Sequence, residues 1–134
     1  MFDIIARLSL RNLLVVDAVT CVVMGALLLV AGGLLAGPLG LPADLLFYAG
    51  LLLLPVAAFM VLVALPARTS GTGAGIVVAG NWLWVAASIA LPVLGLVAPS
   101  ALGLVFLIVQ AVAVAVLAIL EQKAIAGRQP AMAG

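Results

Sequence analysis

Long apolar stretches alternate along the chain with short clusters of charged, Gly and Pro residues. A helix needs roughly 20 mostly apolar residues to cross the hydrocarbon core of a bilayer. The chain reaches that length four times, so the pattern predicts four membrane-spanning helices. They are expected at residues 13–36, 45–65, 75–94 and 100–120.

Short turn-forming segments separate the four expected spans. Gly and Pro recur in 37–42 and 95–99, and 66–73 is the most polar segment in the interior of the chain. Connections this short leave consecutive helices antiparallel. The expected fold is therefore all-α: an integral membrane four-helix antiparallel bundle over residues 13–121, with a short N-terminal interfacial helix before it.

The two ends of the chain differ from the spans. Asp3, Arg7 and Arg11 recur every four residues and so share one stripe of a helix. Residues 1–12 are expected to form an amphipathic helix in the membrane interface or a helical extension of the first span, and the pattern leaves both open. Residues 122–134, which are rich in small side chains, are expected to form a flexible cytoplasmic tail.

All the basic residues fall on one side of the predicted topology. They lie before the first span, between the second and third, and after the fourth. Lys and Arg near span ends stay preferentially in the cytoplasm. The chain is therefore expected in the cell inner membrane, multi-pass, with both termini cytoplasmic. The five residues are Arg7, Arg11, Arg68, Lys123 and Arg128.

The composition indicates that the solvent is mostly lipid, and it excludes several classes of function. Hydrophobic residues make up 69% of the chain and charged residues 7%, whereas soluble domains take about a quarter of their residues from charged types. The net charge of +1 provides no basic surface for nucleic acid. With one cysteine, Cys21, and no histidine, a disulfide, zinc or haem site is not expected, and no cofactor or metal is predicted.

A few polar side chains fall inside the expected spans, where a charge at the helix centre costs roughly 2.5–3.5 kcal/mol by insertion scales. Asp17 lies about one turn into the first span, Asn81 about two turns into the third, and Gln110 near the middle of the fourth. Glu121 returns to the face of Gln110 at the cytoplasmic edge.

The directions of the spans allow Asp17, Asn81 and Gln110 to meet in the inner half of the bundle, and these three residues are the candidate site. One hypothesis is a hydrated pocket in which Asp17 supplies a charge or a titratable proton. The preferred interpretation is interhelical hydrogen bonding that fixes helix register, at about 0.6 kcal/mol per contact.

Two resemblances bear on the architecture. The segment 80–88 (GNWLWVAAS), with Asp17 early in the first span and Gln110 before an Ala/Val-rich stretch ending in Glu121, resembles a group of small four-span bacterial inner-membrane proteins with no assigned activity. That resemblance implies the topology and nothing about chemistry. The four-span plan with a carboxylate in the first span also resembles small multidrug resistance exporters in outline, but Asp17 is shallower and aromatic residues are fewer than in those exporters.

No arrangement of residues typical of an enzyme is present. The chain has no nucleophile–base pair, and its Gly-rich segment 71–75 lacks the Lys of a phosphate-binding loop. A structural or accessory component of a membrane complex is therefore expected, in contact with the lipid bilayer and either homo-oligomeric or bound to a larger complex. The alternative is a small-solute or drug/proton transporter that uses an intramembrane carboxylate.

The predicted topology can be mapped with single cysteines in a Cys21→Ser background. Asp44→Cys, Thr72→Cys and Gln129→Cys variants would each be treated on intact cells with a membrane-impermeant thiol reagent. We expect labelling at position 44 alone, because four spans leave only that site outside the cell. Labelling at position 72 or 129 would show that the span count or the orientation is wrong.

Overall fold

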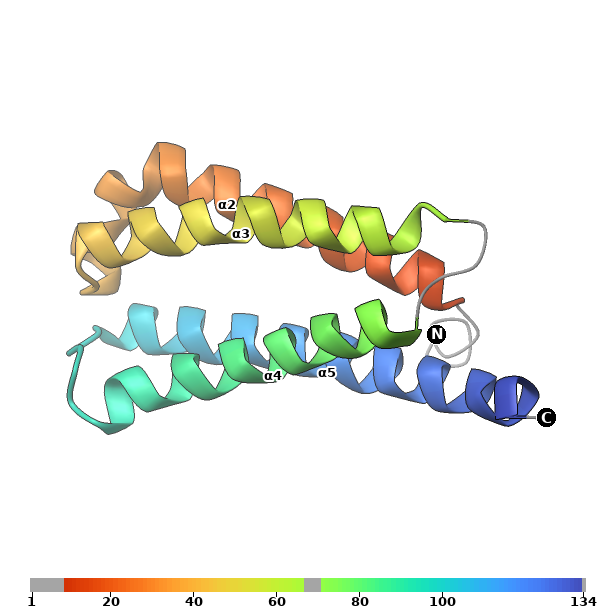
Figure 1. Ribbon diagram of the computed structural model, residues 1–134. Helices are drawn as coiled ribbons and strands as arrows, with labels where there is room; N and C mark the ends of the chain where they lie inside the picture. Colours follow the sequence, from red (N-terminus) through yellow and green to blue (C-terminus); the bar gives the residue numbers. More distant parts are fainter. Residues whose placement is uncertain (1–8, 67–70, 134) are drawn as a thin grey trace.

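The computed structural model describes residues 9–66 and 71–133, with side chains described as far as residue 127. It is all-helical (Figure 1). All four helices contain a stretch long and apolar enough to cross a membrane, which confirms the prediction of four such helices. The helices are α2 (Leu10–Leu39), α3 (Ala43–Ala64), α4 (Gly71–Val93) and α5 (Ala101–Ala133).

Local capping determines where α2 begins and ends. The Ser9 hydroxyl accepts a hydrogen bond from the Asn12 amide at 3.2 Å, which satisfies a free donor of the first turn. At the other end Gly40 takes φ +67°, a left-handed conformation that Gly adopts without strain. The helix is therefore longer at both ends than the predicted span. Residues 1–8, which hold most of the expected interfacial helix, lie outside the described residues.

α5 extends well beyond the predicted end of the fourth span. We expected a flexible tail from residue 122, but the helix continues to Ala133. Residues 122–126 are Gln, Lys, Ala, Ile and Ala, of which most favour a helix, and Gly127 is the first residue there that disfavours one. Glu121 therefore lies in the interior of a continuous helix rather than at its end.

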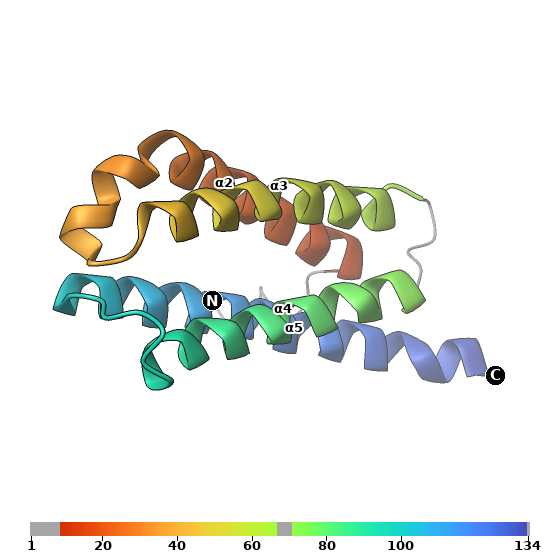
Figure 2. The same ribbon diagram turned by 60° about the vertical axis from the view of Figure 1, so that its left-hand side comes forward.

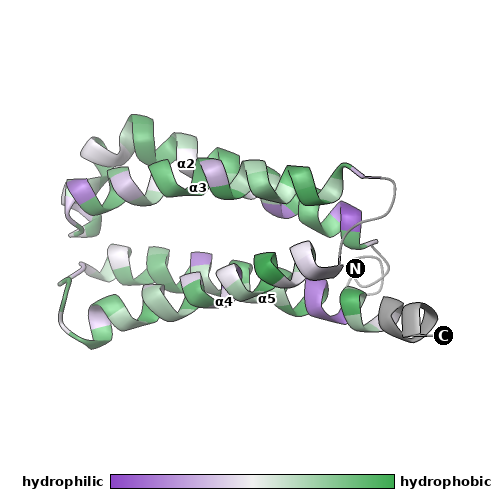
Figure 3. Ribbon diagram, viewed as in Figure 1, coloured by the Kyte–Doolittle hydropathy of each residue, from purple (hydrophilic) through white to green (hydrophobic). Residues whose placement is uncertain are grey.

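The helices form two hairpins stacked as two layers, α2 with α3 and α4 with α5 (Figures 1 and 2). We call the end at which α2 begins and α3 ends the terminal end, and the opposite end the turn end. The two layers meet mainly through α2 and α5. Most of the ribbon is hydrophobic, and hydrophilic positions are few (Figure 3). Large apolar side chains such as Val30 and Leu34 are more than four-fifths exposed on the outside.

Glycines let the backbones approach closely at two places. Where α2 crosses α3, a Cβ on Gly50 would lie 2.8 Å from the carbonyl oxygen of Gly25. At the turn end, a Cβ on Gly103 would overlap the carbonyl oxygen of Leu39. Neither contact leaves room for a side chain.

Ser100 joins the two hairpins beside the Gly103 contact. Its amide donates to the Leu39 carbonyl at 3.0 Å, and its hydroxyl donates to the Pro38 carbonyl at 2.6 Å. The same hydroxyl accepts from the Gly103 amide at 3.1 Å. The start of α5 is thus hydrogen-bonded to the end of α2.

Gly103→Ala should lower the unfolding free energy by about 1–3 kcal/mol, because the new methyl group must displace backbone. Gly33→Ala is the matched control, since a Cβ there meets nothing within 4 Å and Ala favours a helix by about 1 kcal/mol over Gly. Thermal unfolding of both variants in detergent, followed by circular dichroism, checks this. Equal midpoints for the two variants would contradict the close contact.

Candidate functional site

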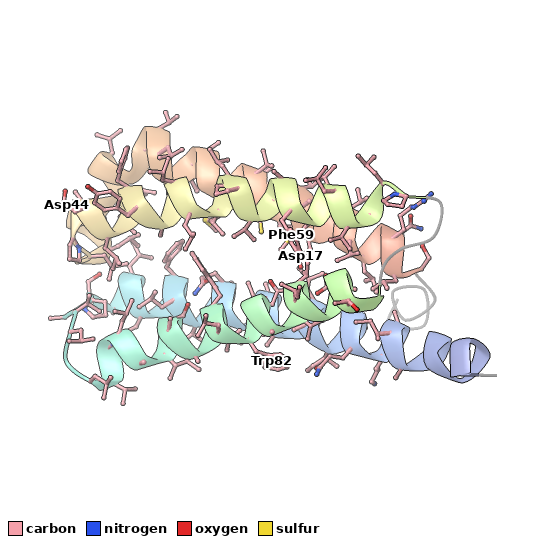
Figure 4. All side chains as sticks on the ribbon, viewed as in Figure 1. Asp17, Asp44, Phe59 and Trp82 are labelled. Atoms are coloured by element: carbon pink, nitrogen blue, oxygen red, sulfur yellow. The ribbon has the colours of Figure 1, made fainter. Side chains whose placement is uncertain are left out.

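A buried polar cluster joins the two hairpins in the half of the bundle nearer the terminal end. It consists of Asp17 of α2, Asn81 of α4 and Glu121 of α5, which we call the carboxyl cluster. Their side chains are 1%, 6% and 0% exposed, respectively. Figure 4 shows Asp17 between the two layers, whereas Asp44 lies at the turn end.

The amide of Asn81 links the two carboxyl groups. Its Nδ2 donates one hydrogen bond to Asp17 Oδ2 at 2.8 Å and another to Glu121 Oε1 at 2.9 Å. Both hydrogens of the amide are therefore used. Because both oxygens contact the same nitrogen, the two carboxyl groups are held close together in the interior.

Helical periodicity places these side chains inward. On α2, Asp17 lies three and seven residues after the buried Leu14 and Leu10, on the same face. On α4, Asn81 follows the buried Val77 at a spacing of four. On α5, Glu121 follows the fully buried Ala118 at a spacing of three. Each polar residue thus continues the apolar face with which its helix packs.

On its own helix, the carboxyl group of Asp17 has only a weak contact. The thiol of Cys21 lies 3.9 Å from Asp17 Oδ1 and 4.0 Å from the sulfur of Met60 on α3. The Thr20 hydroxyl donates to the backbone carbonyl of Asp17 at 2.7 Å, not to its carboxyl. Apart from the amide of Asn81, the carboxyl therefore has only a weak thiol donor on this side.

Among the described side chains, no cation pairs with either carboxyl group. The guanidinium of Arg11 instead donates to the backbone at the end of α3, at 2.9 Å to Ala64 and 3.4 Å to Leu65, and also to Pro66. Lys123 is exposed on α5. Arg11 therefore ties α2 to α3, and no described cation lies against the carboxyl cluster.

Glu121 Oε2 is buried and has no hydrogen-bond partner among the described residues. A buried polar atom without a partner is costly, and two adjacent carboxylates disfavour being ionised together. A proton on the pair would reduce the repulsion and supply the donor that carboxylates lack. The arrangement is thus suited to binding a proton.

Gln110 lies in a separate network. Its Oε1 accepts from the Trp84 indole at 2.7 Å, and its Nε2 donates to Ser88 Oγ at 2.8 Å and to the Leu107 carbonyl at 3.0 Å. Ser88 in turn donates to the Trp84 carbonyl at 2.8 Å. The amide has partners at both ends and ties α4 to α5.

The structure thus brings together two of the three candidate residues, Asp17 and Asn81, and adds Glu121 in place of Gln110. Eleven residues separate Gln110 from Glu121, a rise of about 16 Å along α5. The sequence carried a signal for Glu121, because three helical turns return it to the face of Gln110. Because the fourth span was expected to end at Leu120, Glu121 was placed at the membrane edge and was not included in the candidate site.

The carboxyl cluster differs from a metal site in its donors. The described residues contain no group of three or more His, Cys, Asp or Glu placed to hold a metal ion. Between the two carboxyl groups stands an amide nitrogen, which donates hydrogen bonds and cannot act as a ligand in this orientation. The chemistry that the geometry supports is proton binding, because Glu121 Oε2 lacks a partner among the described residues.

Asn81→Leu should lower the unfolding free energy by at least about 2 kcal/mol, because it leaves two buried carboxyl groups without their shared donor. Ser88→Ala is the control: it removes an interhelical acceptor and should cost nearer 0.6 kcal/mol. Asp17→Asn in the Asn81→Leu background should recover part of the loss by placing an amide beside Glu121. Unfolding in detergent measures all three, and equal losses for Asn81→Leu and Ser88→Ala would contradict the assignment.

Comparisons with known proteins leave the chain without an assigned relative. No family model matches it, and neither a curated protein nor a solved structure matches it significantly. The resemblance to small four-span inner-membrane proteins therefore stays a prediction, and function must be argued from the carboxyl cluster.

Proposed function

We propose that this chain is a multi-pass inner-membrane protein, with both termini in the cytoplasm, that transports a small solute in exchange for protons bound by the carboxyl cluster. The observation that carries the proposal is the pair of buried carboxyl groups on one amide, with Glu121 Oε2 lacking a partner among the described residues. Ionisable groups at membrane depth are costly and mark ion pathways or proton relays.

A purely structural role accounts less well for two carboxyl groups. Gln110, Ser88 and Trp84 fix α4 against α5 with neutral groups whose hydrogen bonds are satisfied. Neutral hydrogen-bonding groups of this kind would also be able to join α2 to α4 and α5. Two carboxylic acids, Asp17 and Glu121, occupy that position, and acids differ from amides in that they titrate.

The basic residues support the orientation. Arg11 lies in the first turn of α2, and Lys123 follows Glu121 on α5, so both are in the same half of the bundle as the carboxyl cluster. Since Lys and Arg flanking spans stay in the cytoplasm, the cluster would face the cytoplasmic half of the membrane. A proton released from it would have the shorter route to that side.

The hydrogen bonds divide the molecule into two units that could move. Arg11 ties α2 to α3, and Gln110 ties α4 to α5. Between the hairpins, side-chain hydrogen bonds occur at the carboxyl cluster and at Ser100. Losing the proton would set two negative charges against one amide and weaken the first connection. The hairpins would then separate at the terminal end and pivot about the Ser100 contact.

A second function, an accessory subunit of a larger membrane complex, is favoured by a different surface. Gly33 and Gly37 lie one turn apart on the exposed side of α2, and a Cβ on either would meet nothing within 4 Å. This small-residue spacing lets a helix of another chain approach closely. Purification in mild detergent separates the two functions: a stoichiometric larger partner would favour the accessory role.

Transport can be tested in proteoliposomes that enclose a pH-sensitive dye under an inside-acid gradient. Adding a lipophilic cation, tetraphenylphosphonium or ethidium, should accelerate proton efflux through the wild-type chain. Asp17→Asn and Glu121→Gln should abolish that acceleration, because each leaves a single carboxyl in the cluster. Asp44→Asn, at the exposed start of α3, should retain it.

The proposal fails if proton efflux is the same in all four proteins with either cation. An acceleration that survives both cluster substitutions would place the coupling elsewhere. Circular dichroism of each reconstituted variant establishes that it is folded before the fluxes are compared.

A further inference from the structure

The two acids of the carboxyl cluster are not equivalent. Each accepts one hydrogen bond from Asn81. The second oxygen of Asp17 has the Cys21 thiol beside it at 3.9 Å, whereas the second oxygen of Glu121 is buried with no partner among the described residues. A carboxyl oxygen in such a position gains most from carrying a proton, because the proton removes the charge and makes the oxygen a donor.

We infer that Glu121 is the proton-binding residue of this protein, protonated while the two hairpins are closed, with Asp17 as the neighbouring acceptor. The inference rests on the proposed function and deepens it, since it names the residue that carries the coupling proton. In this arrangement Asn81 holds both carboxyl groups in place, and the proton belongs to Glu121.

No described cation lies beside Glu121 to favour the ionised form of its carboxyl group. The titratable side chains that face it come from α2, namely Asp17 and Cys21. α3 contributes the uncharged Met60 beside that thiol, and α4 contributes the Asn81 amide. The guanidinium of Arg11 is held by carbonyls of α3, and Lys123 is exposed.

An apolar layer separates Glu121 from the terminal end. Its residues come from the start of α2, the end of α3, the start of α4 and the stretch of α5 after Glu121, and they pack as one cluster. Exchange of the Glu121 proton with water would therefore require this layer to open, which links proton release to separation of the hairpins. The layer includes Leu10, Leu14, Ala64, Ala74, Val77 and Ile125.

Infrared spectroscopy of the purified, reconstituted chain tests the inference without relying on transport. A protonated carboxyl group has a C=O stretch that is resolved from those of carboxylates and amides. At neutral pH we expect this band in the wild type and in Asp44→Asn, and its loss in Glu121→Gln. In Glu121→Asp the band should return at a shifted frequency, which controls for any general effect of substitution.

Stability gives an independent measurement. Gln has nearly the shape of a protonated Glu and can also donate a hydrogen bond, so Glu121→Gln should unfold at or above the wild-type midpoint in detergent. Asp17→Asn should unfold below it, because the substitution replaces an acceptor that faces the donors of Asn81 and Glu121. A packing role alone would make the two substitutions similar.

The inference is overturned if the wild type shows no protonated-carboxyl band at neutral pH, or if the band disappears in Asp17→Asn and persists in Glu121→Gln. The result is separable from the transport assay. A Glu121 band without solute-driven proton efflux would leave the proton site standing and reject transport. Efflux without the band would leave transport standing and reject Glu121 as the proton site.

Discussion

The side-chain amide of Asn81 is the interaction on which the described arrangement depends. It joins three of the four helices, because its two N–H groups reach Asp17 on α2 and Glu121 on α5. In an apolar interior, the cost of an unsatisfied carboxyl group is higher than in water, so the position of each acid is strongly constrained. Satisfying these groups stabilises one register of α2, α4 and α5, together with the packing contacts between the helices.

The other connections act at the opposite end or within each hairpin. Ser100 and Gly103 hold the start of α5 against the end of α2 through backbone contacts that admit no side chain at position 103. Gly25 and Gly50 bring α2 and α3 together in the same way. These contacts are hydrogen bonds between neutral groups or steric contacts, and none of them involves a titratable side chain. Of these connections between the hairpins, the carboxyl cluster is the one built from titratable side chains, and this gives the proposed exchange a place in the fold.

Two polar networks within the bundle differ in burial and in their balance of donors and acceptors. The Gln110 network consists of neutral groups with complementary donors and acceptors, and it needs nothing further. The carboxyl cluster has one amide for two acids and leaves an oxygen over. A buried site with fewer hydrogen-bond donors than acceptors can be satisfied by binding a proton, and the proposed function rests on this shortage of donors.

Within the described residues, the sequence by itself determined the number of apolar helices long enough to cross a membrane and, to within a few residues at most ends, where they lie, because apolar length and turn-forming residues are local properties. It also identified Asp17 and Asn81 as candidate residues, since a polar residue inside an apolar span is conspicuous. The fourth span was expected to end at residue 120, because Glu121 and Lys123 were interpreted as leaving the membrane, whereas the helix itself continues to Ala133, since charge alone does not end a helix.

Only the tertiary structure decided which polar residues meet. The side chains of Gln110 and Glu121 share a face of α5, and periodicity cannot choose between them. The choice depends on the height at which α2 and α4 cross α5, which is fixed by contacts such as Gly103 against Leu39 and Gln110 against Trp84. Those contacts join residues distant in the sequence, and they place Glu121 rather than Gln110 beside Asp17 and Asn81.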